Sequence, residues 1–318
     1  MKPNIPLARY KFTYQAIDPV SLPAFADPLW RSVFGLALKQ LSCIAEDTQL
    51  NQCDSCMLRY QCDYSFLTTG PNPPGEKAGI TKGMKSIPNP HLFHGEIRDY
   101  TVKIPKGATF STHLVLIGNA NERLPAVIRA MVQVGMLGLG GRRSKLRLLE
   151  VSQVGPEPLP RLIMANQTIL ASGRPGPIAP PDPPEAIRFS FITPYLMPSN
   201  IPVEEGFDAA RLFMQIVRRV SSLHEPYTGT PLEVDFRHLK SLAQIPTILE
   251  TDLEVRKGYS YASNRKKFIA VRGSFVVSLT TIEELWPWLY LGQWLNVGKL
   301  GSKGFGRYSL TETDVGES

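Results

Sequence analysis

The chain has 318 residues, of which 43% are hydrophobic and 20% are charged, and its formal net charge is +7 at neutral pH. This length suits two domains of about 150 residues, and the hydrophobic content is enough for packed cores. No window approaches about 18 uninterrupted apolar residues and no apolar run follows Lys2, which excludes a membrane span and a signal peptide. We therefore expect a cytoplasmic protein, and the positive charge favours nucleic acid or another polyanion as its partner.

The first half begins with a strand and a helix. Alternating apolar residues from Ala8 to Ile17 predict a strand. A helix is predicted to follow, with Asp27 as its N-cap, Pro28 at its first position and an apolar face from Trp30 to Leu41. The later elements predicted in this half are two strands, a helix and a strand, over residues 93–103, 109–117, 122–133 and 145–151.

All four cysteines lie in one polar segment after the predicted helix. They are Cys43, Cys53, Cys56 and Cys62, spaced C-x9-C-x2-C-x5-C. Thiolates this close together in a reducing compartment favour a tetrahedral zinc site over disulfides. An iron–sulfur cluster, or free cysteines with a chance C-x2-C, remain alternatives. Four protein ligands leave no open position, so the predicted zinc is structural and the reaction would need no catalytic metal.

A glycine-rich loop occurs in both halves. The core V-G-x-L-G begins at Val134 and again at Val297, and each copy follows an apolar helical stretch and precedes a strand. Closely spaced glycines let backbone N–H groups approach an anion, and flanking Lys and Arg side chains supply positive charge. The repetition predicts two related domains that bind a polyanion.

A proline-rich connector over residues 171–185 is predicted to separate a first domain, residues 1–170, from a second, residues 186–318. In the first domain, residues 43–62 form a Cys-rich insertion, and in the second the glycine loop spans residues 297–307. An extra short helix capped by Asp235 interrupts the second domain. Its other elements are predicted over residues 187–193, 208–223, 249–256, 268–279, 281–295 and 307–311. The pattern is an α+β fold with two tandem ferredoxin-like (RRM-like) βαββαβ domains.

In this topology the start of the first helix, the hairpin between the second and third strands and the glycine loop share one end of the sheet. Cations fall at that end in both domains and tyrosines in the second, and together they suit RNA, because cations bind phosphates and aromatic faces stack on unpaired bases. For Arg265 and its lysine neighbours, a solvated hairpin tip is the alternative. The residues expected at this end are Arg31, Lys103, Lys106, Arg142, Arg143 and Lys145 in the first domain and Tyr259, Tyr261, Arg265, Lys266, Lys267, Lys299, Lys303 and Arg307 in the second.

The sequence resembles the RAMP superfamily of CRISPR-associated proteins, and within it the endoribonucleases that cut precursor CRISPR RNA inside each repeat. The terminal G-S-K-G-F-G-R-Y-S-L loop is the most specific part of the resemblance. Nearly the whole chain takes part. The other matching segments are Leu22-Pro23, the Trp30-Arg31 helix, Cys53–Cys62, Pro90-His91, the first glycine loop, Asp235-Phe236-Arg237 and Tyr261-x-Ser263-x-Arg265.

The resemblance implies an enzyme that binds the stem-loop of the repeat, cleaves it by attack of a 2′-hydroxyl without a metal, and retains the product. A non-catalytic RNA-binding subunit of a CRISPR effector complex is the main alternative, since such subunits share the loop. A zinc-stabilised RNA-binding protein unrelated to CRISPR is a third. The expected partners are repeat RNA and other effector subunits, with no membrane.

The catalytic residues are the least determined part of this reading. Family members commonly carry a histidine on or near the first helix, but this chain has none between Asp18 and Leu41. The remaining candidates are Arg31, His91 and His94, and the two histidines could reach the site only if the Cys-rich insertion folds over. We expect His113, His224 and His238 to be structural.

Overall fold

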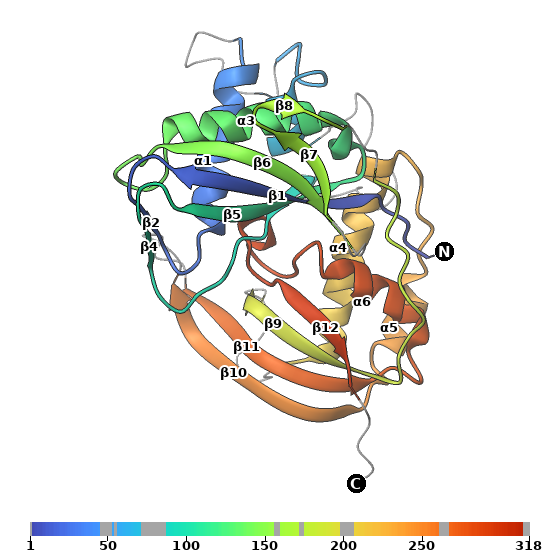
Figure 1. Ribbon diagram of the computed structural model, residues 1–318. Helices are drawn as coiled ribbons and strands as arrows, with labels where there is room; N and C mark the ends of the chain where they lie inside the picture. The colour runs from blue at the N-terminus through green and yellow to red at the C-terminus, as the bar shows by residue number, and fades with distance from the viewer. Residues whose placement is uncertain are drawn as a thin grey trace. The chain divides into compact units, whose positions relative to one another are not determined.

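The computed structural model describes residues 2–44, 53, 56–70, 87–155, 160–171, 175–197, 207–260 and 267–313, without the side chains of residues 257–260 and 267. The chain divides into two compact units. One comprises Ile5–Pro177 and Glu225–Thr230, and the other comprises Met1–Asn4, Ile178–His224 and Pro231–Ser318. We call them the first and second domains (Figure 1).

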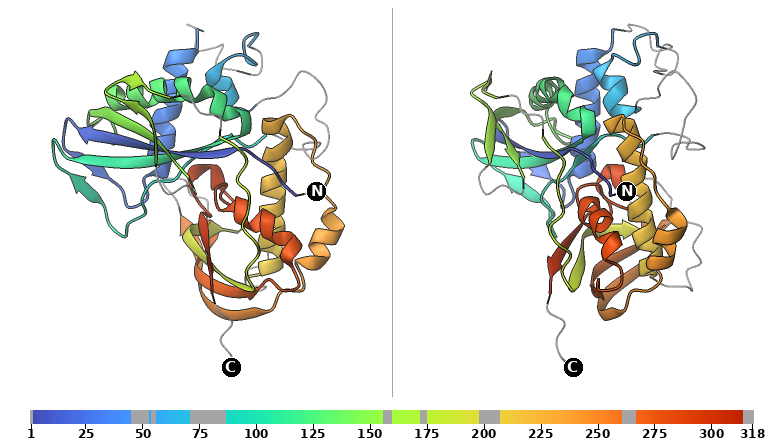
Figure 2. Two further views of the ribbon diagram at one scale, coloured as in Figure 1. Left: turned by 45° about the vertical axis from the view of Figure 1, so that its right-hand side comes forward. Right: turned by 90° about the vertical axis from the view of Figure 1, so that its right-hand side faces the viewer.

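The first domain is built on an antiparallel sheet with the strand order β3-β5-β1-β6-β7-β8. Helices α1 and α3 pack side by side against one face of this sheet (Figures 1 and 2). The phenols of Tyr10 and Tyr14 on this face donate hydrogen bonds to Asn121 Oδ1 and to the carbonyl of Met131. The strands are β1 (Leu7–Ala16), β3 (His91–Phe93), β5 (Thr109–Ile117), β6 (Leu146–Val154), β7 (Arg161–Ala165) and β8 (Thr168–Ile169), and the helices are α1 (Asp27–Ser42) and α3 (Leu124–Leu137).

Helix α1 begins one residue earlier than the predicted cap implies. Ala26 is the N-cap and gives no side-chain hydrogen bond, so the prediction of Asp27 as the cap was wrong. Asp27 is instead the first helical residue, and its Oδ1 accepts a 2.7 Å bond from the amide of Gly95. Trp30, Phe34 and Leu38, spaced four residues apart, are buried against the sheet as predicted.

The predicted strand over residues 93–103 is divided in two. Strand β3 ends at Phe93, and β4 (Val102–Ile104) pairs with β2 (Val20–Leu22) in a separate two-stranded sheet. The chain leaves the ladder at Gly95, where an added Cβ would lie 2.7 Å from Asp27 Oδ1. The contact between Gly95 and Asp27 therefore directs the backbone away from β5.

The second domain repeats the topology, with the strand order β10-β11-β9-β12. Phe189 stacks on Tyr308 and on Phe275 at centroid distances of 4.1 and 5.0 Å, and these rings form the centre of its core. Both domains are thus ferredoxin-like, as predicted. The elements are β9 (Ala186–Leu196), α4 (Ala209–Thr228), α5 (Phe236–Leu242), β10 (Ile248–Ser260), β11 (Lys267–Ser278), α6 (Trp286–Gly292) and β12 (Tyr308–Glu312).

Helix boundaries in the second half differ from the predictions at two places. Helix α4 continues past Leu223 to Thr228, with Pro226 inside it. Its last turn is held by Tyr227, which is fully buried and donates a 2.7 Å hydrogen bond to the carbonyl of Pro88. The helix predicted over 281–295 is a 3-10 turn, η6 (Glu283–Leu285), followed by the shorter α6.

The remaining short elements connect the larger ones. They are α2 (Asp63–Thr68), η4 (Gly118–Arg123) and η7 (Gly301–Lys303). The side chain of Asp235 caps α5 as predicted, accepting bonds from the amides of Arg237 and His238. Within the described part of the chain, no helix combines the length and the apolar character needed to cross a membrane.

Candidate nucleic-acid interface

In the first domain the glycine loop, the end of β1 and the turn before β5 meet at one end of the sheet. The amide of Ile17 bonds to the carbonyl of Lys145 at 3.0 Å, and the amide of Gly107 to the carbonyl of Ala16 at 2.7 Å. The hydroxyl of Ser144 donates to the carbonyl of Pro19 at 2.8 Å. The glycine loop and the turn before β5 therefore lie at the same end of the sheet, whereas the start of α1 is bonded to Gly95.

The first glycine loop is a tight turn closed by reciprocal backbone bonds between Leu139 and Ser144. Gly138 has a φ of +84°, and a Cβ there would lie 2.1 Å from the carbonyl oxygen of Arg143. Arg143 itself has a φ of +49°. The turn leaves Arg142 and Arg143 exposed at its tip.

Lys145 follows this loop but directs its charge back into the domain. Its Nζ donates to the carbonyls of Met136 and Leu137, at 2.5 and 3.4 Å. Both carbonyls belong to the last turn of α3, where a cation complements the helix dipole. Lys145 thus stabilises the helix end that carries the loop, whereas the nearby Lys103 and Lys106 are exposed.

Arg31 lies one turn into α1 and is half-buried. Removal from water lowers the pKa of its guanidinium. Within the described residues Arg31 forms no ion pair, and its Nε is buried without a hydrogen-bond partner. A desolvated cation without a carboxylate partner is a suitable group for an incoming phosphate.

His91 lies within electrostatic reach of Arg31 but beneath the surface. It is 1% exposed, and its ring packs edge-on against Phe34 at 5.3 Å. Burial, and then the charge of Arg31, lower the pKa of His91 to about 3. As folded, His91 is a neutral ring that does not reach the surface.

The two histidines of this segment also lie away from the glycine loop along the sheet. His91 pairs with Leu116, whereas the loop end of β5 is at Thr109, a separation of roughly 24 Å along an extended strand. His94 is 4% exposed, and its amide bonds to the carbonyl of His113. Both positions are set by the sheet ladder and do not depend on the Cys-rich insertion.

The second glycine loop is fixed to the end of β9 by backbone bonds. Val297 and Gly306 are joined at 2.9 Å, and the amides of Lys299 and Gly306 bond to the carbonyls of Leu196 and Pro194. A Cβ on Gly306, whose φ is +69°, would lie 1.8 Å from the carbonyl oxygen of Val297. Only glycine fits this position without moving the backbone.

Two polar residues that the sequence analysis did not single out hold this loop in place. The hydroxyl of Thr193 donates to the carbonyl of Gly304 and accepts from the amide of Arg307, both at 2.8 Å. The side-chain amide of Asn296 donates a hydrogen bond from Nδ2 to the carbonyl of Gly301 at 3.0 Å. A hydroxyl at the end of a predicted strand and an Asn directly before a glycine loop were the available signals.

The second loop carries three cations, of which Lys299 lies close to the tip of the β10–β11 hairpin. Lys299, Lys303 and Arg307 are half-buried, and Lys299 Nζ is 5.9 Å from the centre of the Phe268 ring. The backbones of Tyr259 and Lys267 lie at this tip, paired with Phe268 and Ser260. Tyr261, Arg265 and Lys266 lie outside the described residues.

The four cysteines are gathered between the end of α1 and the start of α2. Burial, and then the thiols of Cys62, Cys43 and Cys56, raise the pKa of Cys53. All four are free of disulfides. Among the described residues, no group of three or more histidine, cysteine or acidic side chains is arranged to hold a metal ion.

Comparison with known families covers both domains. The N-terminal domain family AF_1859_N matches residues 5–176, and the family of the CRISPR-associated endoribonuclease Cas6 matches residues 189–308. By its first domain the chain belongs to the AF_1859_N family, and its residues 189–308 are similar to the family of the CRISPR-associated endoribonuclease Cas6. No curated protein matches it.

Solved structures share the fold at low sequence identity. A Cas6 product complex matches with a TM-score of 0.53 and 14% identity, over 96% of this chain and 99% of that chain. Thermus thermophilus Cas6 matches with a TM-score of 0.50 and 11% identity, over 96% of this chain and 99% of that chain. A chain of a partial Cas6-RT-Cas1–Cas2 complex has a TM-score of 0.55 and 10% identity, and the match covers 99% of this chain but 47% of that longer one.

Proposed function

We propose that this protein cleaves the repeat of precursor CRISPR RNA without a metal and stays bound to the product. The match of residues 189–308 to the family of the endoribonuclease Cas6 supports the class of reaction. The observation that carries the RNA-binding part is the second glycine loop, where Lys299, Lys303 and Arg307 stand half-buried on a rigid backbone. A solved relative described as a Cas6 product complex supports retention of the product.

In the proposed reaction the RNA supplies its own nucleophile. A 2′-hydroxyl loses its proton and its oxygen attacks the adjacent phosphorus, while the bond from phosphorus to the 5′-oxygen breaks and that oxygen takes up a proton. The products are a 2′,3′-cyclic phosphate and a 5′-hydroxyl. The protein has to align these atoms and stabilise the added negative charge, which positioned cations can do.

We assign that stabilising role to Arg31, because it is desolvated and forms no ion pair within the described residues. His91 and His94 remain the candidate general bases from the sequence. Their burial and, for His91, a pKa of about 3 favour a structural role over proton transfer at neutral pH.

The proposed RNA-binding residues form two groups of cations and tyrosines, one at the glycine-loop end of each domain. In the first, Arg142 and Arg143 would contact phosphates, and Lys145 would act through the helix end that it caps. In the second, the loop cations and the hairpin tip would hold RNA between charge and aromatic faces. The residues of the second group are Tyr259, Tyr261, Arg265, Lys266, Lys267, Lys299, Lys303 and Arg307.

A non-catalytic RNA-binding subunit of a CRISPR complex is the second candidate. The specific observation that favours it is that α1 carries no histidine, and Leu36 and Lys39 occupy its later turns. The similar chain in a Cas6-RT-Cas1–Cas2 complex supports other CRISPR proteins as partners.

Incubation with a labelled CRISPR repeat RNA from the source genome, in EDTA, separates the two candidates. We expect a single cut whose 5′ fragment ends in a 2′,3′-cyclic phosphate. RNA that is bound tightly yet stays whole in EDTA and in magnesium would assign the chain to the binding subunits.

We also propose that Cys43, Cys53, Cys56 and Cys62 bind one structural zinc ion. After burial, the other three thiols raise the pKa of Cys53, and this mutual influence of neighbouring thiols supports the proposal, although the described side chains do not form a metal-binding arrangement. The zinc would tie the end of α1 to α2. The start of α2 is also anchored by the 2.6 Å ion pair between Asp63 and Arg123.

Elemental analysis of protein purified without chelators tests the zinc proposal. We expect about one equivalent of zinc, which Cys56→Ser should release with a lower melting temperature. Ser42→Ala, beside the cluster, is the matched control and should keep the metal. Metal-free wild-type protein would contradict the proposal.

A further inference from the structure

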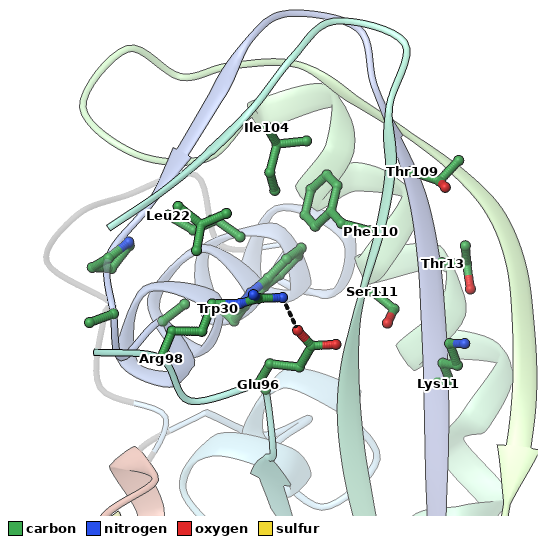
Figure 3. Close-up of a pocket in the computed structure, with 15 residues that line it drawn as sticks. Lys11, Thr13, Leu22, Trp30, Glu96, Arg98, Ile104, Thr109, Phe110 and Ser111 are labelled. Carbon is green, nitrogen blue, oxygen red and sulfur yellow. Dashed lines mark hydrogen bonds and ion pairs between the residues drawn. The ribbon is translucent and has the colours of Figure 1, made fainter. Parts of the chain in front are cut away.

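The first domain contains a pocket of about 340 Å³ at the loop end of its sheet, which the RNA-binding residues above do not include. Leu22 and Ile104 of the β2–β4 ladder, Trp30 of α1 and Phe110 of β5 form its apolar side (Figure 3). Lys11, Thr13, Thr109 and Ser111 form its polar side. A volume near the lower end of the range for ligand pockets suits one small planar ligand and not a longer segment of chain.

One wall of this pocket is an open strand edge. In the described part of the chain, the ladder between β3 and β5 ends where the amide of His94 bonds to the carbonyl of His113. Backbone groups alternate in direction along a strand, and Ala108 directs its carbonyl towards β1. The N–H and C=O groups of Thr109 and Ser111 therefore point away from β1, along the edge that borders the pocket. They offer adjacent donors and acceptors of fixed geometry.

The mouth of the pocket carries charge and an aromatic ring. Arg98 and Glu96 form an ion pair across it (Figure 3). The bond to Glu96, and more weakly an interaction with Tyr100, raise the pKa of Arg98. Tyr100 interacts with Arg98, is 66% exposed and stands next to the residues that line the pocket without being one of them. This combination of a stackable ring, a cation and a carboxylate occurs where proteins hold unpaired bases.

We propose that this pocket takes one unpaired nucleotide of the bound RNA. The base packs on the apolar side of the pocket, its polar edge meets the backbone of Ser111 and the Glu96–Arg98 pair, and its phosphate faces Lys11. The proposal rests on the proposed RNA-binding function and adds a base-reading subsite to it. A backbone edge and a charged pair can distinguish bases, whereas the glycine loops offer charge and backbone donors for phosphates.

A double-mutant cycle tests the proposal on the full 318-residue chain, combining one substitution in the protein with one abasic substitution in the RNA. Ala24→Phe fills the pocket, and Ala165→Phe on β7 makes the same change outside it. Single abasic substitutions along the repeat RNA find the position whose base is held. We expect Ala24→Phe and that abasic RNA each to weaken binding by about 5- to 100-fold, the range for one stacked base, and the pair together to weaken it no further. Ala165→Phe should bind like the wild type.

Two results would overturn the subsite while leaving the RNA-binding function intact. One is wild-type affinity in Ala24→Phe. The other is a loss of RNA affinity in Ala24→Phe that is additive with the loss caused by each abasic substitution, whichever position is tested. Melting temperatures of both variants show whether a loss reflects unfolding, and Arg98→Ala, an exposed change at the mouth, should weaken the same position more mildly.

If the protein does not bind the repeat RNA, the proposed function fails. The pocket can then still be tested with free nucleotides. Each of the four nucleoside 5′-monophosphates is titrated by calorimetry into wild type and Ala24→Phe. Binding that Ala24→Phe removes would support a nucleotide pocket independent of RNA. Absence of binding to both RNA and nucleotides would overturn it.

Discussion

The glycine-loop ends of the two domains have the same topology but place their charged groups differently. In the first domain, Lys145 at the glycine loop caps α3, whereas Arg31 is half-buried on α1 within electrostatic range of His91, which lies away from that loop. In the second, three half-buried cations stand on one loop that is bonded to the end of β9. The common framework is thus a backbone held by glycines, and the charged side chains added to it are placed differently in the two domains.

This difference predicts that the two domains contribute to different steps, the first to cleavage and the second to RNA binding. Desolvated charge in the first domain interacts strongly with a phosphate that enters, which suits stabilisation of a transition state. Three cations on one loop of the second domain can bind several phosphates with little rearrangement, which suits affinity. Changes in the first domain should therefore affect cleavage or stability, and changes in the second should affect binding.

The largest effect is expected from pH on the buried His91. Its folded pKa of about 3 is below its ordinary value of 6.5, so below about pH 6.5 the unfolded chain takes up a proton that the folded chain does not. Stability should fall by about 1.4 kcal/mol per pH unit between pH 6.5 and 3, roughly 4–5 kcal/mol at most. Urea unfolding of wild type and His91→Phe at several pH values measures this.

Phe34→Leu is the control for the His91 experiment, because it alters the packing of the same ring without removing a titrating group. We expect lower stability with an unchanged dependence on pH. An identical pH dependence in wild type and His91→Phe would show that His91 does not contribute to acid destabilisation.

The next effect concerns cleavage. Arg31→Ala should slow single-turnover cutting by about 10²- to 10³-fold, or 3–4 kcal/mol, with little change in RNA affinity, because charge stabilisation is greatest in the transition state. Arg31→Lys should recover part of the rate, and Arg129→Ala, an exposed arginine on α3, should cut normally. Normal cutting by Arg31→Ala would move the chemistry away from this helix.

The glycines that shape the loops come third. Gly138→Ala and Gly306→Ala should each destabilise their domain by about 2–3 kcal/mol, because both residues have positive φ and a Cβ would meet backbone atoms. Gly141→Ala is the control, since nothing lies within 4 Å of its would-be Cβ. If Gly138→Ala and Gly306→Ala have the same melting temperature as Gly141→Ala, the described loop geometry is contradicted.

The smallest effect, about tenfold or 1.4 kcal/mol, is expected from the loop charges. A Lys299/Lys303/Arg307 triple alanine variant should weaken repeat-RNA binding and reduce the slope of log affinity against log salt by about 2, at about 0.7 per phosphate contact. The Arg142/Arg143 double variant should change that slope by about 1. Equal slopes for the triple variant and wild type would mean that these cations are merely solvated.

Sequence patterns located the main strands, because alternation and strong turn residues coincide there. The prediction of a strand over 109–117 agrees with β5 residue for residue, and the glycine loops fall between helix and strand as expected. The β7–β8 extension was missed because its strands are short and lie beside prolines, which argue against a strand.

The candidate site was less predictable, because it depends on contacts between distant residues. No local pattern shows that Gly95 leaves the sheet to meet Asp27, and that contact divides the predicted strand and places one wall of the pocket. The burial of His91 behind Phe34 and the hydrogen bond from Lys145 Nζ to the last turn of α3 likewise depend on tertiary structure. Residue type and spacing predicted one end of each domain as the site but could not predict the orientation of its charges.

Cleavage of a substrate with a single 2′-deoxy substitution at the cut site tests the central claim most directly. The account predicts that the wild-type protein in EDTA binds this RNA as tightly as the unmodified repeat and leaves it intact, while the unmodified repeat is cut. Cleavage of the 2′-deoxy RNA, or dependence of cutting on added magnesium, would contradict it.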